Sequence, residues 1–365
     1  MIKVPFFDLK RQAKAIKNEI LKEIENVIDE CAFSLGFAVE NFEKNFANYL
    51  NIKHVVALNN GTSALHLALR SLNIGENDEV IIPSWTFIAT AWAVSYVGAK
   101  IVFADVDEET WQIDPEDVKR KITKRTKAII GVHIYGQPFN INEILKIANE
   151  YNLYLIEDTA QAHGAEYYNK KVGTFGIVNA FSFYPSKNLG SYGEAGAIAT
   201  NNDEIANRIK ILRNQGQKVR YEHVEIGYNM RMEGFQGAVL NVKLKYLDKW
   251  NERRREIAKR YLNEINNPKI KFQKVVEGGK GVYHLFVIKV KDREKFINHL
   301  EKFGVGYSFH YPKPVHLQKA YEFLNYKEGS LPITEELSRT TISIPLFPEM
   351  TDEEVNYVIN VINDY

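Results

Sequence analysis

Lys187 is the residue whose surroundings in the sequence most clearly suggest a chemical role. It lies between the aromatic run 181–184 and a glycine-rich turn over residues 190–196, with apolar segments on both sides. An ammonium group that is poorly solvated in such a place loses affinity for its proton and can attack a carbonyl carbon. Lys187 is therefore a candidate Schiff-base lysine. A turn lysine that points into water is the alternative, and this stretch alone does not separate the two.

A second candidate site is the segment 59–63, Asn-Asn-Gly-Thr-Ser, which follows the apolar run 55–58 and opens a helical pattern. Gly61 lets the backbone come close to a ligand, and the free amides at the start of a helix bind anions, phosphate above all. Thr62 and Ser63 are candidate phosphate ligands in this setting. An ordinary helix cap by Thr62 or Ser63 explains the segment equally well.

Two further polar positions follow apolar runs. Trp85 comes after the run 80–83 and could stack on a flat ring, or could be a core residue. Asp158 directly follows a wholly apolar run, at a place where a carboxylate must be paired. The nearest histidines, His133 and His163, do not stand at the spacing of a metal site, so we expect no metal. A carboxylate opposite a protonated heteroaromatic nitrogen fits Asp158 better.

Together these positions specify one cofactor, pyridoxal phosphate. It needs a lysine that captures an aldehyde, a helix start that binds phosphate, an aromatic side chain that stacks on a ring, and an aspartate for a pyridinium nitrogen. Lys187 would form the imine and, once the substrate has displaced it, would carry the proton of the substrate α-carbon. Asp158 would keep the ring nitrogen protonated, so that the ring accepts the electrons released there.

The sequence predicts a large α/β domain that brings these positions together. Short apolar runs alternate with helical patterns, which is typical of a mostly parallel sheet covered on both faces. Such sheets bind their ligands beyond the carboxyl ends of the strands. The expected strands are 55–58, 80–83, 101–106, 128–133 and 153–158, joined by 180–184 and 196–200. The expected helices between them lie at about 62–72, 86–97, 115–122 and 141–151.

The rest of the chain predicts helices around this domain and a second, smaller domain. Amphipathic helices are expected at 10–30 and after Gly36, and the charged region 203–265 is expected to be helical. We expect the large domain to span 1–245 and a C-terminal α+β domain to span 246–365. The expected elements of the second domain are a strand at 283–290, a helix at 292–303, a short strand near 305–309, an irregular segment at 310–318, a strand at 342–346 and a helix at 352–363.

The composition narrows the class of protein. Among 365 residues, 47 Lys and Arg balance 46 Asp and Glu, which gives a net charge of +1 and no sign of a nucleic-acid-binding surface. No apolar run is long enough to span a bilayer, and residues 1–12 lack the layout of a signal peptide. Cys31, the single cysteine, excludes an internal disulfide and a thiolate metal cage. We therefore expect a cytoplasmic protein that acts on small molecules, without a nucleic-acid or membrane partner.

Long segments of the sequence match a known family in residue type and in order. They include NNGTSALHLAL (59–69), PSWTFIATAWAV (83–94), IEDTAQAHGA (156–165), FSFYPSKNLGSYGEAGAIATN (181–201), GYNMRMEGFQGAVL (227–240) and HYPKPVHLQKAY (310–321). The chain closely resembles, over essentially its whole length, the DegT/DnrJ/EryC1/StrS sugar aminotransferases of the aspartate-aminotransferase superfamily. The resemblance implies the PLP-dependent transferase fold type I, in which a mostly parallel seven-stranded sheet flanked by helices carries a smaller C-terminal α+β domain.

Carried over position by position, the resemblance implies roles in binding the cofactor. Lys187 resembles the lysine that forms the imine and transfers protons, and Asp158 resembles the partner of the pyridine nitrogen. Trp85 resembles the residue that stacks on the ring, and Gln161 the side chain that contacts the ring hydroxyl. The implied phosphate ligands are Gly61, Thr62 and Ser182, together with Asn229 donated by the neighbouring subunit of a homodimer.

The resemblance also implies positions on the substrate side. Arg231 and His310 resemble residues that contact the sugar nucleotide, with a helix-capping arginine and a loop histidine as the alternatives. Tyr184 stands where many relatives have histidine, and the segment 234–237 stands where many have an acidic residue and QAA. Both departures lie near the predicted substrate. They leave the identity of the sugar undecided but do not affect the assignment of the cofactor.

The activity implied by the resemblance is transfer of an amino group from L-glutamate to a keto group of a nucleotide-linked deoxysugar. A dTDP- or UDP-linked hexose is typical, with the 3-keto position preferred over the 4-keto, and pyridoxamine phosphate is the intermediate form of the cofactor. A keto-cyclitol or another non-nucleotide ketosugar stays an open alternative. Lys187 argues against a dehydratase, which carries histidine there, and the position of Cys31 argues against cysteine desulfuration. A catalytically silent binding or regulatory protein would be expected to have lost part of the constellation.

Overall fold

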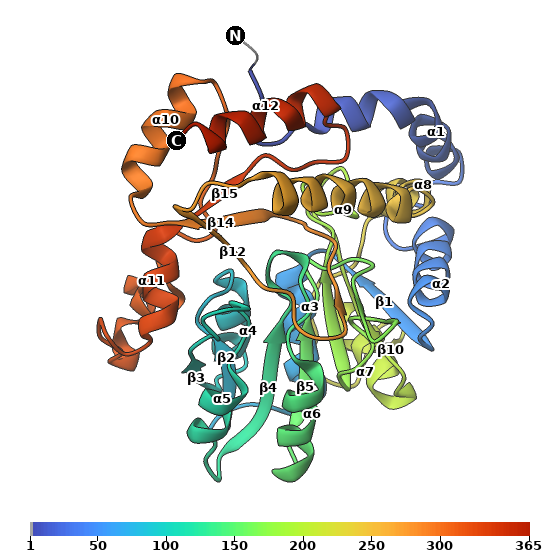
Figure 1. The fold of residues 1–365 in the computed structure, drawn as a ribbon. Helices are drawn as coiled ribbons and strands as arrows, with labels where there is room; N and C mark the ends of the chain where they lie inside the picture. The colour runs from blue at the N-terminus through green and yellow to red at the C-terminus, as the bar shows by residue number, and fades with distance from the viewer. Residues whose placement is uncertain (1–2) are drawn as a thin grey trace.

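The computed structural model describes residues 3–365, and a seven-stranded sheet forms its centre (Figure 1). The strand order is β1-β9-β8-β5-β4-β2-β3. Strand β9 runs antiparallel to both of its neighbours, whereas the other neighbouring pairs are parallel. The strands are β1 (His54–Leu58), β2 (Glu79–Pro83), β3 (Lys100–Ala104), β4 (Thr126–Val132), β5 (Tyr154–Asp158), β8 (Val178–Ser182) and β9 (Gly196–Thr200). The predicted seven strands and their α/β arrangement are therefore confirmed.

Both faces of the sheet are buried, because alternate residues of each strand enter different hydrophobic cores. Ile82 and Ile130 pack with α3, α4 and α7, whereas Ile81 and Ile129 pack with α5 and α6 on the opposite face. This double burial explains why the strands read as continuous apolar runs. The helices are α2 (Phe37–Leu50), α3 (Gly61–Ser71), α4 (Ala89–Tyr96), α5 (Pro115–Lys121), α6 (Ile141–Glu150) and α7 (Asp203–Arg213).

The prediction of continuous helix over 203–265 is wrong in its middle. Helix α7 ends at Arg213, and a small hairpin of β10 (Gln217–Val219) and β11 (Glu222–His223) precedes α8 (Gly234–Leu244) and α9 (Leu247–Glu264). Glycines make the interruption possible, because Gly216 has φ +74° and a Cβ on Gly227 would lie 1.9 Å from the Gly216 nitrogen. Two backbone segments therefore touch where any side chain would separate them.

A second, antiparallel sheet forms a separate core above the large one in Figure 1. It orders β12 (Ile270–Phe272), β14 (Phe286–Val290) and β15 (Thr341–Ile344), and packs with α9, α10 (Arg293–Lys302) and α12 (Asp352–Asn363). Instead of the strand predicted near 305–309, single bridges join Val305 to Val4 and Ser308 to Ser343. The division at 245/246 stays a prediction. Other elements are α1 (Leu9–Asp29), β6 (Glu166–Tyr167), β7 (Lys170–Lys171), β13 (Gly279–Lys280) and η1 (Ile134–Gly136).

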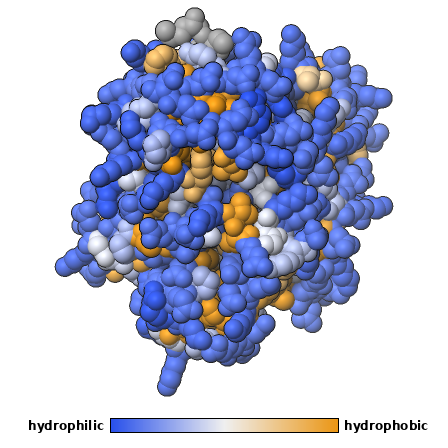
Figure 2. All heavy atoms as spheres, viewed as in Figure 1, coloured by the Kyte–Doolittle hydropathy of each residue, from blue (hydrophilic) through white to orange (hydrophobic). Residues whose placement is uncertain are grey.

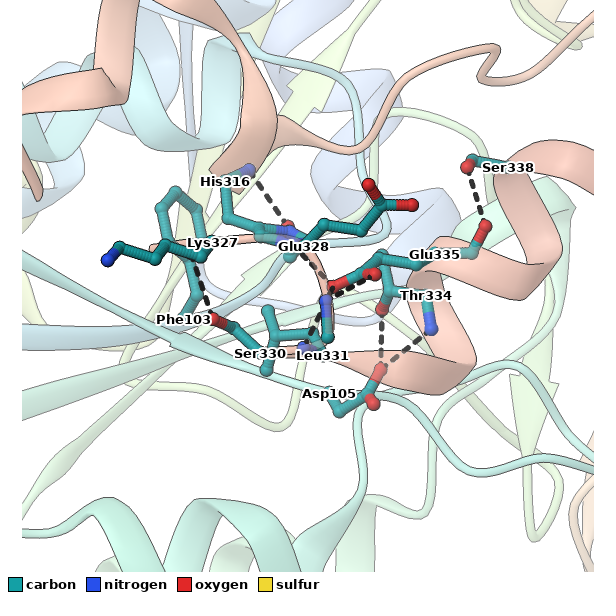
Figure 3. A network of polar contacts seen from close by, with 12 residues as sticks. Phe103, Asp105, His316, Lys327, Glu328, Ser330, Leu331, Thr334, Glu335 and Ser338 are labelled. Carbon is teal, nitrogen blue, oxygen red and sulfur yellow. Dashed lines mark hydrogen bonds and ion pairs between the residues drawn. The ribbon is translucent and has the colours of Figure 1, made fainter. Parts of the chain in front are cut away.

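Residues 315–340 return to the edge of the large sheet through η2 (Val315–Leu317), η3 (Lys319–Leu324) and α11 (Pro332–Thr340). Figure 3 shows the polar network that holds them there. Asp105, just after β3, accepts hydrogen bonds from the Thr334 amide at 2.8 Å and the Thr334 hydroxyl at 2.7 Å. A carboxylate at the first turn of α11 satisfies amides that have no partner within the helix.

The same network contains a serine, a histidine and a carboxylate in a row. Ser84 Oγ lies 2.7 Å from His316 Nδ1, and His316 Nε2 lies 3.2 Å from Glu335 Oε1. Although this order resembles a nucleophile relay, the exposed fractions of the three residues are 0%, 1% and 2%, so a substrate has no access to the hydroxyl. The relay instead fixes Ser84 at the end of β2, and with it the start of the loop that follows.

Most residues on the surface are hydrophilic, as expected when the apolar residues are buried in the cores. Figure 2 shows a largely hydrophilic face with hydrophobic residues gathered near its middle. Within residues 3–365, no helix combines the length and the apolar character needed to cross a bilayer.

Candidate active site

A cavity of about 800 Å³ opens beyond the carboxyl ends of β5 and β8. Asp158 and Ser182 are the last residues of these two strands, and both line the cavity. The structure brings most of the predicted site residues together here, as expected for a parallel sheet. The predicted residues on the cavity wall are Gly61, Thr62, Ser63, Asp158, Gln161, Ser182, Tyr184, Lys187 and His310.

Lys187 is half-buried and lies in a turn closed by its own amide, which donates to the Tyr184 carbonyl at 2.8 Å. Burial lowers the pKa of its ammonium to about 8, although the Asp158 carboxylate opposes this shift. About a tenth of the Lys187 side chains are therefore uncharged at pH 7. The lysine has the reduced proton affinity that an amine nucleophile needs.

Asp158 is 5% exposed and holds two hydrogen bonds. Its Oδ2 accepts from the Thr90 hydroxyl at 2.8 Å, and its Oδ1 accepts from the Ala160 amide at 3.2 Å. Thr86 Oγ1 lies 2.9 Å from Thr90 Oγ1, so a second hydroxyl supports the first. Burial raises the pKa of Asp158, while these donors and the nearby Lys187 ammonium act in the opposite direction. A cationic group in the cavity would stabilise this carboxylate further.

The start of α3 forms a cradle against the end of β8. Asn60 caps the helix by accepting from the Ser63 amide at 2.7 Å, so the capping alternative for Thr62 or Ser63 is wrong. The amides of Gly61 and Thr62 have no acceptor within the helix. A Cβ on Gly61 would lie 2.5 Å from the Ser182 Cβ, which shows why glycine is required at this close approach. The cradle has the free amides and hydroxyls that a phosphate group needs.

Gln161 is held at both ends of its amide. Its Oε1 accepts from the Tyr135 amide at 2.7 Å, and its Nε2 donates to the Tyr311 hydroxyl at 3.0 Å. On the same wall, His310 Nδ1 lies 2.8 Å from Ser343 Oγ, and burial lowers the pKa of His310 to about 4. His310 is therefore a neutral polar group at neutral pH, whereas Tyr184 is exposed at the cavity rim.

Trp85, the predicted stacking residue, does not line the cavity. It is 1% exposed and packs in a core with Val106 and Tyr135. Phe87 lines the cavity instead and is 52% exposed. The core alternative for Trp85 therefore holds, because a large indole gains more from burial, and the loop after β2 turns it inward.

Asn229 and Arg231 also lie outside the cavity of their own chain. Asn229 is exposed, and Arg231 donates to Asn214 Oδ1 at 2.9 Å and to Ser34 Oγ at 3.3 Å. A role at an active site would therefore have to be played in a neighbouring copy.

The cavity and near-cavity residues that were not singled out from the sequence include Phe87, Thr90, His284 and Tyr311. Phe87, Thr90 and Tyr311 stand inside segments that carried the family resemblance. His284 had no such signal, because it lies outside those segments; it falls within the strand expected at 283–290, whereas β14 begins only at Phe286. Among residues 3–365 no cluster of three or more His, Cys, Asp or Glu side chains has the arrangement of a metal site.

Comparison with known proteins shows which family the chain belongs to. The model of the DegT/DnrJ/EryC1/StrS aminotransferase family matches residues 14–363. The chain is 44% identical to dTDP-3-amino-3,6-dideoxy-alpha-D-galactopyranose transaminase from Aneurinibacillus thermoaerophilus, over 99% of each chain. It is 40% identical to a pleiotropic regulatory protein from Geobacillus stearothermophilus, over 99% of this chain and 98% of the relative.

Its fold is similar to the crystal structure of S. venezuelae DesV in complex with a ketimine intermediate. The TM-score is 0.98 at 40% identity, and the match covers 100% of this chain and 98% of that chain. These findings confirm the predicted fold type and the predicted class of enzyme, a pyridoxal-phosphate-dependent transaminase. The chain belongs to the DegT/DnrJ/EryC1/StrS aminotransferase family.

Proposed function

We propose that this protein transfers an amino group from L-glutamate to the keto group of a nucleotide-linked deoxysugar, with pyridoxal phosphate as cofactor. The observation that carries the proposal is the joint presence of Lys187 and Asp158 in one cavity, with the pKa of the lysine lowered to about 8. A nucleophilic amine and a buried carboxylate with room for a cation are the two groups that this cofactor requires.

The residues that line the cavity fit the cofactor. When bound, it supplies an aldehyde that exchanges amines and a protonated ring that accepts electrons from the substrate. Asp158 would hold the ring nitrogen, Gln161 the ring hydroxyl, and Phe87 one face of the ring. The phosphate would lie in the cradle of Gly61, Thr62, Ser63 and Ser182. Gly61 lies close to Ser182, and the first amides of α3 are free to donate to the phosphate.

The chain's own groups would then carry the transfer. Lys187 Nζ holds a proton when charged and accepts one when neutral, so it can move a proton at the substrate carbon that gives or receives the amine. Burial raises the pKa of Asp158, and the Thr90 hydroxyl and the Ala160 amide oppose this effect by donating to its ionised form. Neutral His310 and exposed Tyr184 offer polar contacts to a sugar without adding charge to the wall.

The acceptor we propose is a dTDP- or UDP-linked hexose with a keto group at C3, in preference to C4. Support comes from the Aneurinibacillus thermoaerophilus relative, whose name specifies a dTDP-3-aminosugar. A keto-cyclitol or a sugar without a nucleotide is the second candidate. A purely regulatory function is the reading favoured by the name of the Geobacillus relative, but the intact constellation around Lys187 argues for catalysis.

A homodimer with shared active sites accounts for Asn229 and Arg231. Both lie outside the cavity of their own chain, and the neighbouring hairpin exposes apolar side chains, with Tyr221 77% and Ile226 84% exposed. A second copy that covers this hairpin would bury them and bring Asn229 to its phosphate cradle. The cytoplasmic location stays a prediction.

Subunit complementation tests the shared site. Lys187→Ala and Asn229→Ala should each be inactive, and equal amounts mixed through reversible unfolding should recover about a quarter of the wild-type activity, because half of the dimers then carry one intact site of two. No recovery, with dimers confirmed by light scattering, would place Asn229 in the site of its own chain, and an active Asn229→Ala would place it outside any site. The activity itself is tested by mass detection of aminosugar after ketosugars are offered together with L-glutamate.

A further inference from the structure

His284 lines the same cavity as Lys187, yet none of the roles above uses it. Its backbone is fixed against η1, because Val282 donates to the Gly136 carbonyl at 2.9 Å and Leu285 to the Tyr135 carbonyl at 3.4 Å. Gly136 has φ +86°, and a Cβ there would lie 2.9 Å from the His284 nitrogen. The second sheet therefore delivers this histidine to the cavity wall at a defined position.

A chain of side-chain amides determines which ring nitrogen of His284 carries the proton. The His163 carbonyl can only accept, so the Asn251 atom that lies 2.8 Å from it is the donor Nδ2. Asn251 Oδ1 is then the acceptor for Asn188 Nδ2 at 2.8 Å, and Asn188 Nδ2 also donates to the Val282 carbonyl at 3.1 Å. Both donors of Asn188 are thereby used, which leaves its Oδ1 as an acceptor.

The His284 ring donates a hydrogen bond to this acceptor. Its Nδ1 lies 3.2 Å from Asn188 Oδ1, so Nδ1 carries the hydrogen and Nε2 carries a lone pair. Burial lowers the pKa of His284 well below its ordinary value, and the nearby Lys187 and Arg254 cations lower it further. The imidazole is therefore neutral at working pH. Within residues 3–365, His284 Nε2 has no hydrogen-bond partner, and Lys187 does not bond to it. This nitrogen is therefore open to a ligand.

We propose that His284 is a sugar-binding residue whose Nε2 accepts a hydrogen bond from a hydroxyl of the ketosugar. A bare lone pair requires a donor, and a hexose is rich in hydroxyl donors. The carboxylates of L-glutamate only accept, and the amine of glutamate is the reacting group. The histidine therefore acts in the half-reaction of the sugar and not in that of the amino donor. The inference rests on the proposed function and assigns one determinant of its substrate class.

The first test is independent of catalysis. Nitrogen NMR of the holoenzyme with ¹⁵N-labelled histidine distinguishes the two neutral tautomers, and the His284 signal is identified by its absence in His284→Asn. We expect the Nδ1–H form, without protonation in the pH range where an exposed histidine titrates, since burial lowers the pKa. A dominant Nε2–H form, or a ring that titrates like an exposed histidine, overturns the inference whatever the substrate is.

The second test uses two amides that imitate the two ring nitrogens. Asparagine reaches the place of Nδ1, so His284→Asn keeps the bond to Asn188 and removes the acceptor in the cavity. Glutamine reaches the place of Nε2, so His284→Gln keeps the acceptor and loses the bond to Asn188. We expect kcat/KM for the ketosugar to fall about tenfold in His284→Asn and to stay within about threefold in His284→Gln, the range for one neutral hydrogen bond.

The rate at which L-glutamate converts the holoenzyme should be unchanged in both variants. If His284→Asn resembles the wild type, or if both variants slow the glutamate step, His284 has a structural role and the inference is wrong. If the wild-type protein accepts the amine of glutamate but transfers it to no ketosugar, the proposed function fails. That failure is seen in the wild type, before either variant is compared, and the NMR result still decides the tautomer.

Discussion

Removal of the Thr90 hydroxyl should weaken cofactor binding through Asp158. In Thr90→Val the shape is kept, but Asp158 Oδ2 loses a donor at 2.8 Å in a place where Thr90 is 1% exposed and solvent does not replace it. The pKa of Asp158, already raised by burial, should rise further, because a donor to its ionised form is lost. A hydrogen bond to a charged group contributes about 1.5–3 kcal/mol, so the dissociation constant of the cofactor should increase by about 10- to 150-fold.

The assay is titration of the apoprotein with pyridoxal phosphate, followed by absorbance, with the melting temperature as a check on folding. Thr90→Ser keeps the hydroxyl and should restore most of the affinity. Thr86→Val is the matched control, since its Oγ1 lies 2.9 Å from Thr90 Oγ1 and one bond further from the carboxylate. Wild-type affinity in Thr90→Val, or an equal loss in Thr86→Val, would refute the assignment of Thr90 to Asp158.

Three further predictions concern the cradle, the ring and the lysine. Gly61→Ala places a Cβ 2.5 Å from the Ser182 Cβ, so it should destabilise the fold by about 1–3 kcal/mol and weaken cofactor binding, and unchanged affinity in a titration would contradict the cradle. Phe87→Ala should lower cofactor affinity while Trp85→Phe lowers mainly the melting temperature, and the opposite result would restore the assignment made from the sequence. The pKa of Lys187 is lowered to about 8, so the rate at which the apoprotein captures pyridoxal phosphate should rise about tenfold per pH unit below pH 8 and level off above it. Stopped-flow rates that keep rising toward pH 10 would contradict the lowered pKa.

The sequence predicted the large sheet well, because strands buried on both faces leave continuous apolar runs that helices separate. The carboxyl-end rule correctly predicted that Gly61 and Asp158 lie on one cavity, whereas Ser182 was identified only through the family resemblance. Local pattern failed where glycine contacts decide the path, as at the hairpin after Arg213, and where the strand expected near 305–309 makes only isolated bridges.

The direction of side chains within loops could not be predicted from the sequence. Trp85 and Phe87 are two residues apart in one loop, and only the packing around them decides which one faces the cavity. Thr90 and His284 join the site through partners that lie 68 and 96 residues away in the chain. Such contacts depend on tertiary structure and leave no periodic signal.

The central claim is that Lys187 binds pyridoxal phosphate and that the amine of an amino donor displaces the lysine from the cofactor. The most direct measurement is the visible spectrum of the purified protein with pyridoxal phosphate, before and after addition of L-glutamate, beside that of Lys187→Ala. We expect a yellow band in the wild type that glutamate bleaches and that Lys187→Ala lacks. A band that glutamate leaves unchanged would contradict the proposed donor, and a band that persists in Lys187→Ala would contradict the role of the lysine itself.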